Sequence, residues 1–129
     1  MNLLVYATLE EALYLHELLV AEFGGNHGVR DLGLLESALM RPRSGYYETL
    51  SLQAAALMQS LALNHSFFDG NKRMSFAMTA VFLQLNGFKL TVAPDPAEQF
   101  LIQEIIVKKC DLLVIASWIE KHIKVKSKN

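Results

Sequence analysis

Residues 51 to 63 read SLQAAALMQSLAL, and residues 74 to 85 read MSFAMTAVFLQL. Both stretches have the length of a helix and are apolar on nearly every side, which is typical of helices at the centre of a protein. Shorter amphipathic segments precede and follow them, and residues 43–48 are predicted as a loop or a small hairpin. We therefore predict an all-α fold, a compact bundle of about six helices in one domain over residues 1–129, with at most a short hairpin or flap.

The outer helices of the first half have clear end signals. Thr8 and Glu11 have the spacing of a capping box, in which each side chain binds the backbone N–H of the other residue. Gly24-Gly25 is predicted to end that helix, because glycine readily adopts the left-handed conformation that follows a helix. Asp31 is predicted to cap a second helix, and Pro42 to stop it.

Similar signals divide the second half. Ser51 is predicted to cap the first central helix, and Asn86-Gly87 to end the second. Residues 88–92 are predicted as a short extended piece. Asp95 and Asp111 are predicted as the N-caps of the last two helices.

Composition narrows the class of protein. The formal net charge of −1 gives no bulk electrostatic reason to expect nucleic-acid binding. The single cysteine, Cys110, excludes an internal disulfide, fits a reducing cytosol and is interpreted as a small apolar filler. Charged or polar residues interrupt every apolar run well before about 18 residues, and the N-terminus lacks the pattern of a secretory signal. We expect a cytoplasmic protein without membrane contact.

The chemistry-bearing residues are concentrated in one short run, HSFFDGNKR at residues 65–73, between the two central helices. His65 can accept a proton from an attacking hydroxyl, although a single histidine at a helix end is more often a partner of the helix dipole. Asp69 can cap the following helix or act as an oxygen ligand for Mg²⁺. The residues alone leave both alternatives open.

The start of the second central helix has the features of an anion site. Gly70 allows close approach of the backbone to a ligand, and Asn71 to Arg73 lie in the first turn, where N–H groups are free. Lys72 and Arg73 oppose the helix dipole there, which costs about 0.3–1 kcal/mol for each cation. A bound phosphate would reverse this penalty, so the run predicts a site for a phosphorylated ligand.

Other residues are interpreted as structural. Of the two adjacent aromatics, Phe67 is favoured over Phe68 as the one that turns inward. The remaining histidines, His16, His27 and His122, have no partners at metal-ligand spacing and are interpreted as surface or helix residues, so no zinc site is predicted.

The run resembles the motif of the Fic/Doc family, His-x-Phe-x-Asp/Glu-Gly/Ala-Asn-Gly/Lys-Arg. Further stretches are similar in order and spacing to the death-on-curing (Doc) branch of that family: Phe23-Gly24-Gly25, Gly28-Val29-Arg30-Asp31, residues 33–39 and Leu85-Asn86-Gly87-Phe88. The likeness covers nearly the whole chain and implies the same all-α fold.

The resemblance implies transfer of a phosphate-containing group from a nucleotide to a protein hydroxyl. It makes His65 the base and Asp69 the ligand of Mg²⁺, with ATP as the nucleotide. Gly70 and Asn71 would line an anion hole, and Lys72 and Arg73 would bind the phosphates. Phe67 would be the buried anchor of the loop.

The residue at position 72 differs between the two classes of enzyme that this chain resembles, those that transfer an adenylyl group and those that transfer a phosphate. Adenylyl-transferring Fic enzymes usually have glycine where this chain has Lys72, and arginine where it has Phe76. Doc-like members with the lysine resemble kinases that transfer the γ-phosphate of ATP to a translation elongation factor, and that are paired with a Phd-like antitoxin. Those relatives commonly have threonine where this chain has Met74, which implies weaker support of the site.

Three hypotheses follow. The first is a Doc-like toxin of a toxin–antitoxin system that phosphorylates a Ser or Thr hydroxyl of an elongation factor. The second is a Fic-type protein adenylyltransferase. The third is a catalytically idle module that binds a nucleotide or an antitoxin segment.

Overall fold

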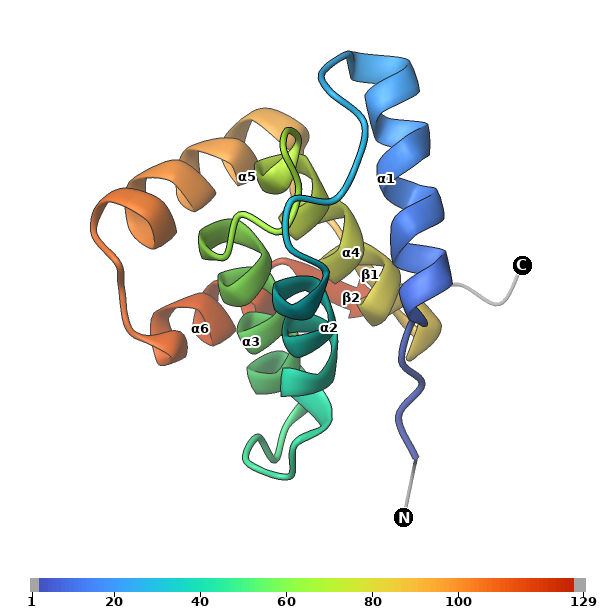
Figure 1. Ribbon diagram of the computed structural model, residues 1–129. Helices are drawn as coiled ribbons and strands as arrows, with labels where there is room; N and C mark the ends of the chain where they lie inside the picture. Colours follow the sequence, from blue (N-terminus) through green and yellow to red (C-terminus); the bar gives the residue numbers. More distant parts are fainter. Residues whose placement is uncertain (1–2, 127–129) are drawn as a thin grey trace.

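The structure is a computed structural model that describes residues 3–126. Six α-helices and two short strands make up most of this part of the chain (Figure 1). The all-α prediction is confirmed. In chain order the elements are α1 (Leu9–Phe23), α2 (Leu32–Met40), α3 (Leu50–Leu63), α4 (Asn71–Leu85), β1 (Phe88–Leu90), α5 (Pro94–Phe100), α6 (Leu112–Lys121) and β2 (Ile123–Val125).

Helix α3 is the centre of the bundle, as its composition predicts. It packs most extensively against α4 and α6, while α2 covers another of its sides and α1 lies along α4 (Figure 1). Helix α5 continues as a π-helix, Leu101–Val107, which also contacts α3. Within residues 3–126, no helix has the length and apolar character needed to cross a bilayer.

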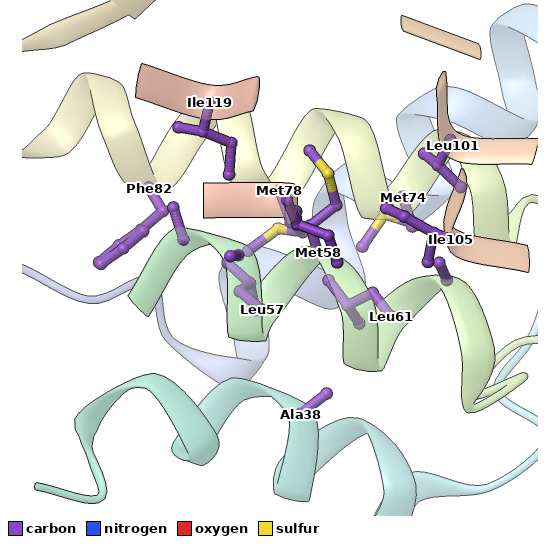
Figure 2. Packing of buried hydrophobic residues seen from close by; sticks show 14 of the residues in the cluster. Ala38, Leu57, Met58, Leu61, Met74, Met78, Phe82, Leu101, Ile105 and Ile119 are labelled. Atoms are coloured by element: carbon purple, nitrogen blue, oxygen red, sulfur yellow. The ribbon is translucent and has the colours of Figure 1, made fainter. Parts of the chain in front are cut away.

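Methionines fill the interface between the two central helices. Met58 of α3 lies between Met74 and Met78 of α4, and all three are at most 1% exposed (Figure 2). The Ser75 hydroxyl is also buried and donates to the Met58 carbonyl at 2.7 Å, so its polarity is satisfied inside the bundle. Met74, one of the departures from the Doc pattern, is therefore a core residue in this chain.

Several helix ends form as predicted. Thr8 and Glu11 make both hydrogen bonds of the capping box, and Gly24 follows the last turn of α1 with a φ of +87°. The Asp31 carboxylate accepts from the Leu34 N–H at 3.0 Å and so caps α2. After α2, a 3₁₀ turn at Arg41–Arg43 contains Pro42 and ends the helical run.

Other details differ from the predictions. Thr49, not Ser51, caps α3, because the Ser51 hydroxyl is used in a hydrogen bond to Glu120 of α6 at 2.7 Å. Helix α5 begins at Pro94, so Asp95 lies inside its first turn and is not its N-cap. Asp111 does occupy the N-cap position of α6, but its side chain makes no capping hydrogen bond.

The small sheet joins distant parts of the chain. Strand β1 pairs antiparallel with β2, with Lys89 opposite Lys124. Residues 88–90 are thus extended as predicted, while residues 43–48 form a turn and a loop without a strand. The half-buried Cys110 fits its role as a filler, and burial raises the pKa of its thiol.

Candidate active site

The motif lies on the loop between α3 and α4, and a second segment holds this loop in place. We call residues 26–31 the strap. Val29 forms an isolated antiparallel bridge with Phe67. The Ser66 carbonyl accepts from the Arg30 N–H at 2.8 Å and from the Asp31 N–H at 3.0 Å. The loop is therefore paired with the backbone of the segment between α1 and α2, and its shape does not depend on the ends of α3 and α4 alone.

His65 stands at the start of this loop, where its ring is exposed. Its backbone is left-handed, with a φ of +52°. The Arg30 guanidinium donates from Nε to the His65 carbonyl at 2.6 Å and from Nη2 to the Asn64 carbonyl at 3.2 Å. A cation at the C-terminal end of α3 also complements the helix dipole. The backbone of His65 is thus fixed while its ring remains accessible to a protein hydroxyl.

Phe67 turns inward, as the sequence favoured. It is 1% exposed, whereas Phe68 is 58% exposed. The Asn71 side chain accepts from the Phe67 N–H at 3.1 Å and donates to the Phe67 carbonyl at 3.0 Å. The amide oxygen and one amide N–H are therefore used within the loop, and the second amide N–H and the backbone N–H of Asn71 remain available to an anion.

Asp69 is not the N-cap of α4, so the first of the two alternatives for this residue, a helix cap, is wrong. The cap position belongs to Gly70, whose backbone is left-handed with a φ of +83°. The Asp69 carboxylate accepts through Oδ2 from the Asn26 N–H of the strap at 2.7 Å. No side chain caps α4, so the N–H groups of its first turn remain free to donate to a ligand beyond the end of the helix.

Two exposed cations flank these N–H groups. Lys72 and Arg73 lie in the first turn of α4, which contains no acidic residue. Neither forms an ion pair with a carboxylate of residues 3–126. The Arg73 guanidinium lies 4.3 Å from the centre of the Phe23 ring, which orients it by a cation–π contact. Free N–H groups and two unpaired cations are the groups that commonly bind phosphate, so this helix end is the candidate phosphate site.

His16 is a member of this site that the sequence pattern did not indicate. It lies on α1, as predicted for a helix residue, but only 2% of it is exposed. Its ring stacks on Phe67, with centroids 3.8 Å apart, and its Nε2 lies 2.8 Å from the Asp69 carbonyl oxygen. The only sequence signal is a polar residue on the apolar face of α1.

The described residues fit a metal ion that is coordinated partly by the protein and partly by a bound substrate. Within residues 3–126, no group of three or more His, Cys, Asp or Glu side chains could hold an ion by itself. Mg²⁺ is commonly bound through one or two carboxylates together with substrate phosphates and water. Asp69 can supply one such carboxylate beside the first turn of α4.

Comparison with known proteins places this site in a family. The family model described as Fic/DOC matches residues 6–83, which include the whole motif. The chain is 44% identical to "Toxin Doc" of Mycolicibacterium smegmatis over 102 residues, which are 74% of this chain and 78% of that protein. It is 31% identical to "Protein kinase doc" of Escherichia phage P1 over 93 residues, which are 69% of this chain and 74% of the phage protein.

The region matched by the family model contains the whole candidate site. The motif from His65 to Arg73 lies inside the matched region, and so do the strap and His16 on α1. The chain belongs to the Fic/Doc family, in the branch of the Doc toxins.

Proposed function

We propose that this chain is the toxin of a toxin–antitoxin system and that it transfers the γ-phosphate of ATP to a Ser or Thr hydroxyl of a translation elongation factor. The main support is the start of α4, where uncapped N–H groups stand in the same helix turn as the exposed Lys72 and Arg73, on the loop that also carries the exposed His65. The names of the two relatives, a toxin and a protein kinase, are in line with this reaction.

In the proposed reaction the hydroxyl oxygen of the target forms a bond to the γ-phosphorus, and the bond from that phosphorus to the β–γ bridging oxygen breaks. The proton of the hydroxyl moves to a ring nitrogen of His65, and ADP leaves. Such a reaction requires mainly positioning and neutralisation of charge. The N–H groups of Gly70 and Asn71 and the side chains of Lys72 and Arg73 supply the positive groups for the phosphates.

Asp69 is the proposed ligand of Mg²⁺, which when bound would neutralise phosphate charge. The Asn26 N–H occupies only Oδ2 of this carboxylate, and within residues 3–126 no hydrogen bond is made to Oδ1. The strap thus orients the carboxylate and leaves one oxygen for the ion.

Substitution of Gly25 should show whether the orientation of Asp69 matters. A Cβ added at Gly25 would lie 3.1 Å from the Asp69 Cβ, so Gly25→Ala displaces the aspartate. We expect the Mg²⁺ concentration for half-maximal activity to rise several-fold. The measurement is a Mg²⁺ titration of phosphoryl transfer.

Gly24→Ala is the matched control for this substitution. Gly24 also has a positive φ, +87°, but an added Cβ would meet nothing within 4 Å. Both variants therefore introduce backbone strain of about 1–3 kcal/mol, and only one presses on Asp69. An equal change in Mg²⁺ requirement in both variants would show that strain alone is responsible.

The reaction itself is tested with two labels. Purified protein, Mg²⁺ and a bacterial lysate are incubated with ATP labelled in either the γ- or the α-phosphate. Lysine at position 72, which the family resemblance associates with phosphorylating members, leads us to expect transfer of the γ-label alone, to an elongation factor. Transfer of the α-label would instead establish adenylyl transfer, and transfer of neither label would favour an idle binding module.

The proposed partner in the cell is a Phd-like antitoxin, supported by the toxin named among the relatives. Its action on translation places the toxin in the cytoplasm. Co-expression with a Phd-like antitoxin is expected to restore growth that the chain alone arrests.

A further inference from the structure

The buried His16, which lies outside the motif, forms a hydrogen bond to the backbone of the proposed anion site. His16 Nε2 lies 2.8 Å from the Asp69 carbonyl oxygen. Because a carbonyl oxygen can only accept, Nε2 must carry the hydrogen and donate it. The ring is held in the plane needed for this bond by its stack on Phe67, with 12° between the two rings. The tautomer of His16 is therefore fixed by its surroundings.

The hydrogen bond from His16 to the Asp69 carbonyl determines the direction of the Gly70 N–H. The peptide between Asp69 and Gly70 is trans, since residues 3–126 contain no cis peptide. In a trans peptide the C=O and the N–H point in opposite directions. With its carbonyl directed at His16, this peptide directs the Gly70 N–H away from α1. Within residues 3–126 no group accepts a hydrogen bond from that N–H.

The same peptide would rotate easily without such a bond. Gly70 has a φ of +83°, and glycine adopts positive and negative φ with similar ease. A rotation of the peptide plane would replace the N–H by a carbonyl oxygen, whose partial negative charge repels phosphate. Asp69 and Gly70 cannot prevent this rotation through their own side chains, because the Asp69 carboxylate is bound to Asn26 and glycine has none.

We propose that His16 is a positioning residue, which holds the peptide between Asp69 and Gly70 in the orientation that presents the Gly70 N–H to the phosphates of the nucleotide. The inference rests on the proposed function for its effect on turnover. Its effect on nucleotide binding can be measured whether or not transfer occurs.

His16→Phe is the informative variant. Phenylalanine keeps the planar ring that stacks on Phe67 but has no donor for the Asp69 carbonyl. His16→Gln keeps an N–H donor on a shorter side chain. As a matched control, His122→Phe removes another histidine-to-carbonyl bond, from Nδ1 to the Trp118 carbonyl at 2.7 Å on α6.

The first readout is the amide NMR spectrum during titration with ADP and Mg²⁺, without any target protein. In the unaltered chain and in His122→Phe we expect the Gly70 amide resonance to shift as ADP binds. In His16→Phe we expect that shift to be lost and binding to weaken by about tenfold, the loss typical of one hydrogen bond. His16→Gln should retain more of the affinity than His16→Phe.

The second readout is kinetic. Because the Gly70 N–H is then no longer held toward the phosphates, kcat/KM for ATP is expected to fall by about 10²-fold in His16→Phe, at a melting temperature similar to that of His122→Phe. If ADP binding and the Gly70 shift behave as expected but no label is transferred by any variant, the proposed reaction fails while the role of His16 stands. A folded His16→Phe protein with an unaltered Gly70 shift would overturn the inference.

A last measurement needs no variant and therefore does not depend on folding of a mutant. The nitrogen resonances of the His16 ring distinguish the two neutral tautomers. The hydrogen is expected on Nε2. A hydrogen on Nδ1 with a bare Nε2 would contradict the bond to Asp69 and overturn the proposal.

Discussion

Replacement of His65 by alanine is expected to lower the rate of phosphoryl transfer by about 10²–10⁴-fold, the usual contribution of a general base. The ring of His65 is exposed, and within residues 3–126 it makes no hydrogen bond through its side chain. Its removal therefore leaves the packing of the loop unchanged. The measurement is transfer of the γ-label of ATP, with growth arrest in bacteria as a second readout.

His65→Asn is the control that separates chemistry from backbone strain. Position 65 has a φ of +52°, a conformation that asparagine and histidine tolerate better than most residues. Asparagine keeps this preference but cannot accept the proton. We expect it to be as inactive as alanine and as stable as the unaltered chain. An active His65→Asn protein would remove His65 from the role of base.

Replacement of Phe67 by alanine is expected to destabilise the fold by about 3–5 kcal/mol, which is typical of a buried aromatic side chain. The ring is 1% exposed and stacks on His16, so its loss opens a cavity under the motif loop. Because total stability is about 5–15 kcal/mol for most proteins, much of the chain's stability is lost. Urea unfolding measures the change.

Phe68→Ala provides the matched comparison, since the same side chain is removed one position later. Phe68 is 58% exposed, and its truncation is expected to change the free energy of unfolding by about 0.5 kcal/mol or less. Similar destabilisation by both substitutions would contradict the assignment of Phe67 as the inward anchor.

Features encoded by neighbouring residues could be predicted from the sequence. The capping box at Thr8, the Asp31 cap and the central position of α3 depend on contacts within a few residues or on composition. Features that depend on contacts between distant residues could not be predicted from the sequence. Ser51 pairs with Glu120, and β1 pairs with β2 across two intervening helices, so neither has a local signal.

The site shows the same division. The unfavourable position of Lys72 and Arg73 at a helix N-terminus can be recognised from neighbouring residues, so the prediction of a phosphate site needs only the local sequence. The choice between cap and ligand for Asp69 depends on the Asn26 N–H, which is 43 residues away in the sequence. The contacts of His16 with Phe67 and Asp69 depend on how α1 packs against the loop, and the sequence gives no signal for that packing.

The strap has a consequence for how sequences of this kind can diverge. Its contacts with the loop at Asn26, Arg30 and Asp31 use main-chain N–H groups, which every residue except proline possesses. Arg30 also binds the His65 and Asn64 carbonyls through its guanidinium. A strap residue whose side chain does not hold the loop can be exchanged without altering the geometry of the loop. His27, which is exposed between these contacts, is such a position. The surface beside the motif can thus change in chemistry while the backbone of the motif loop stays in place.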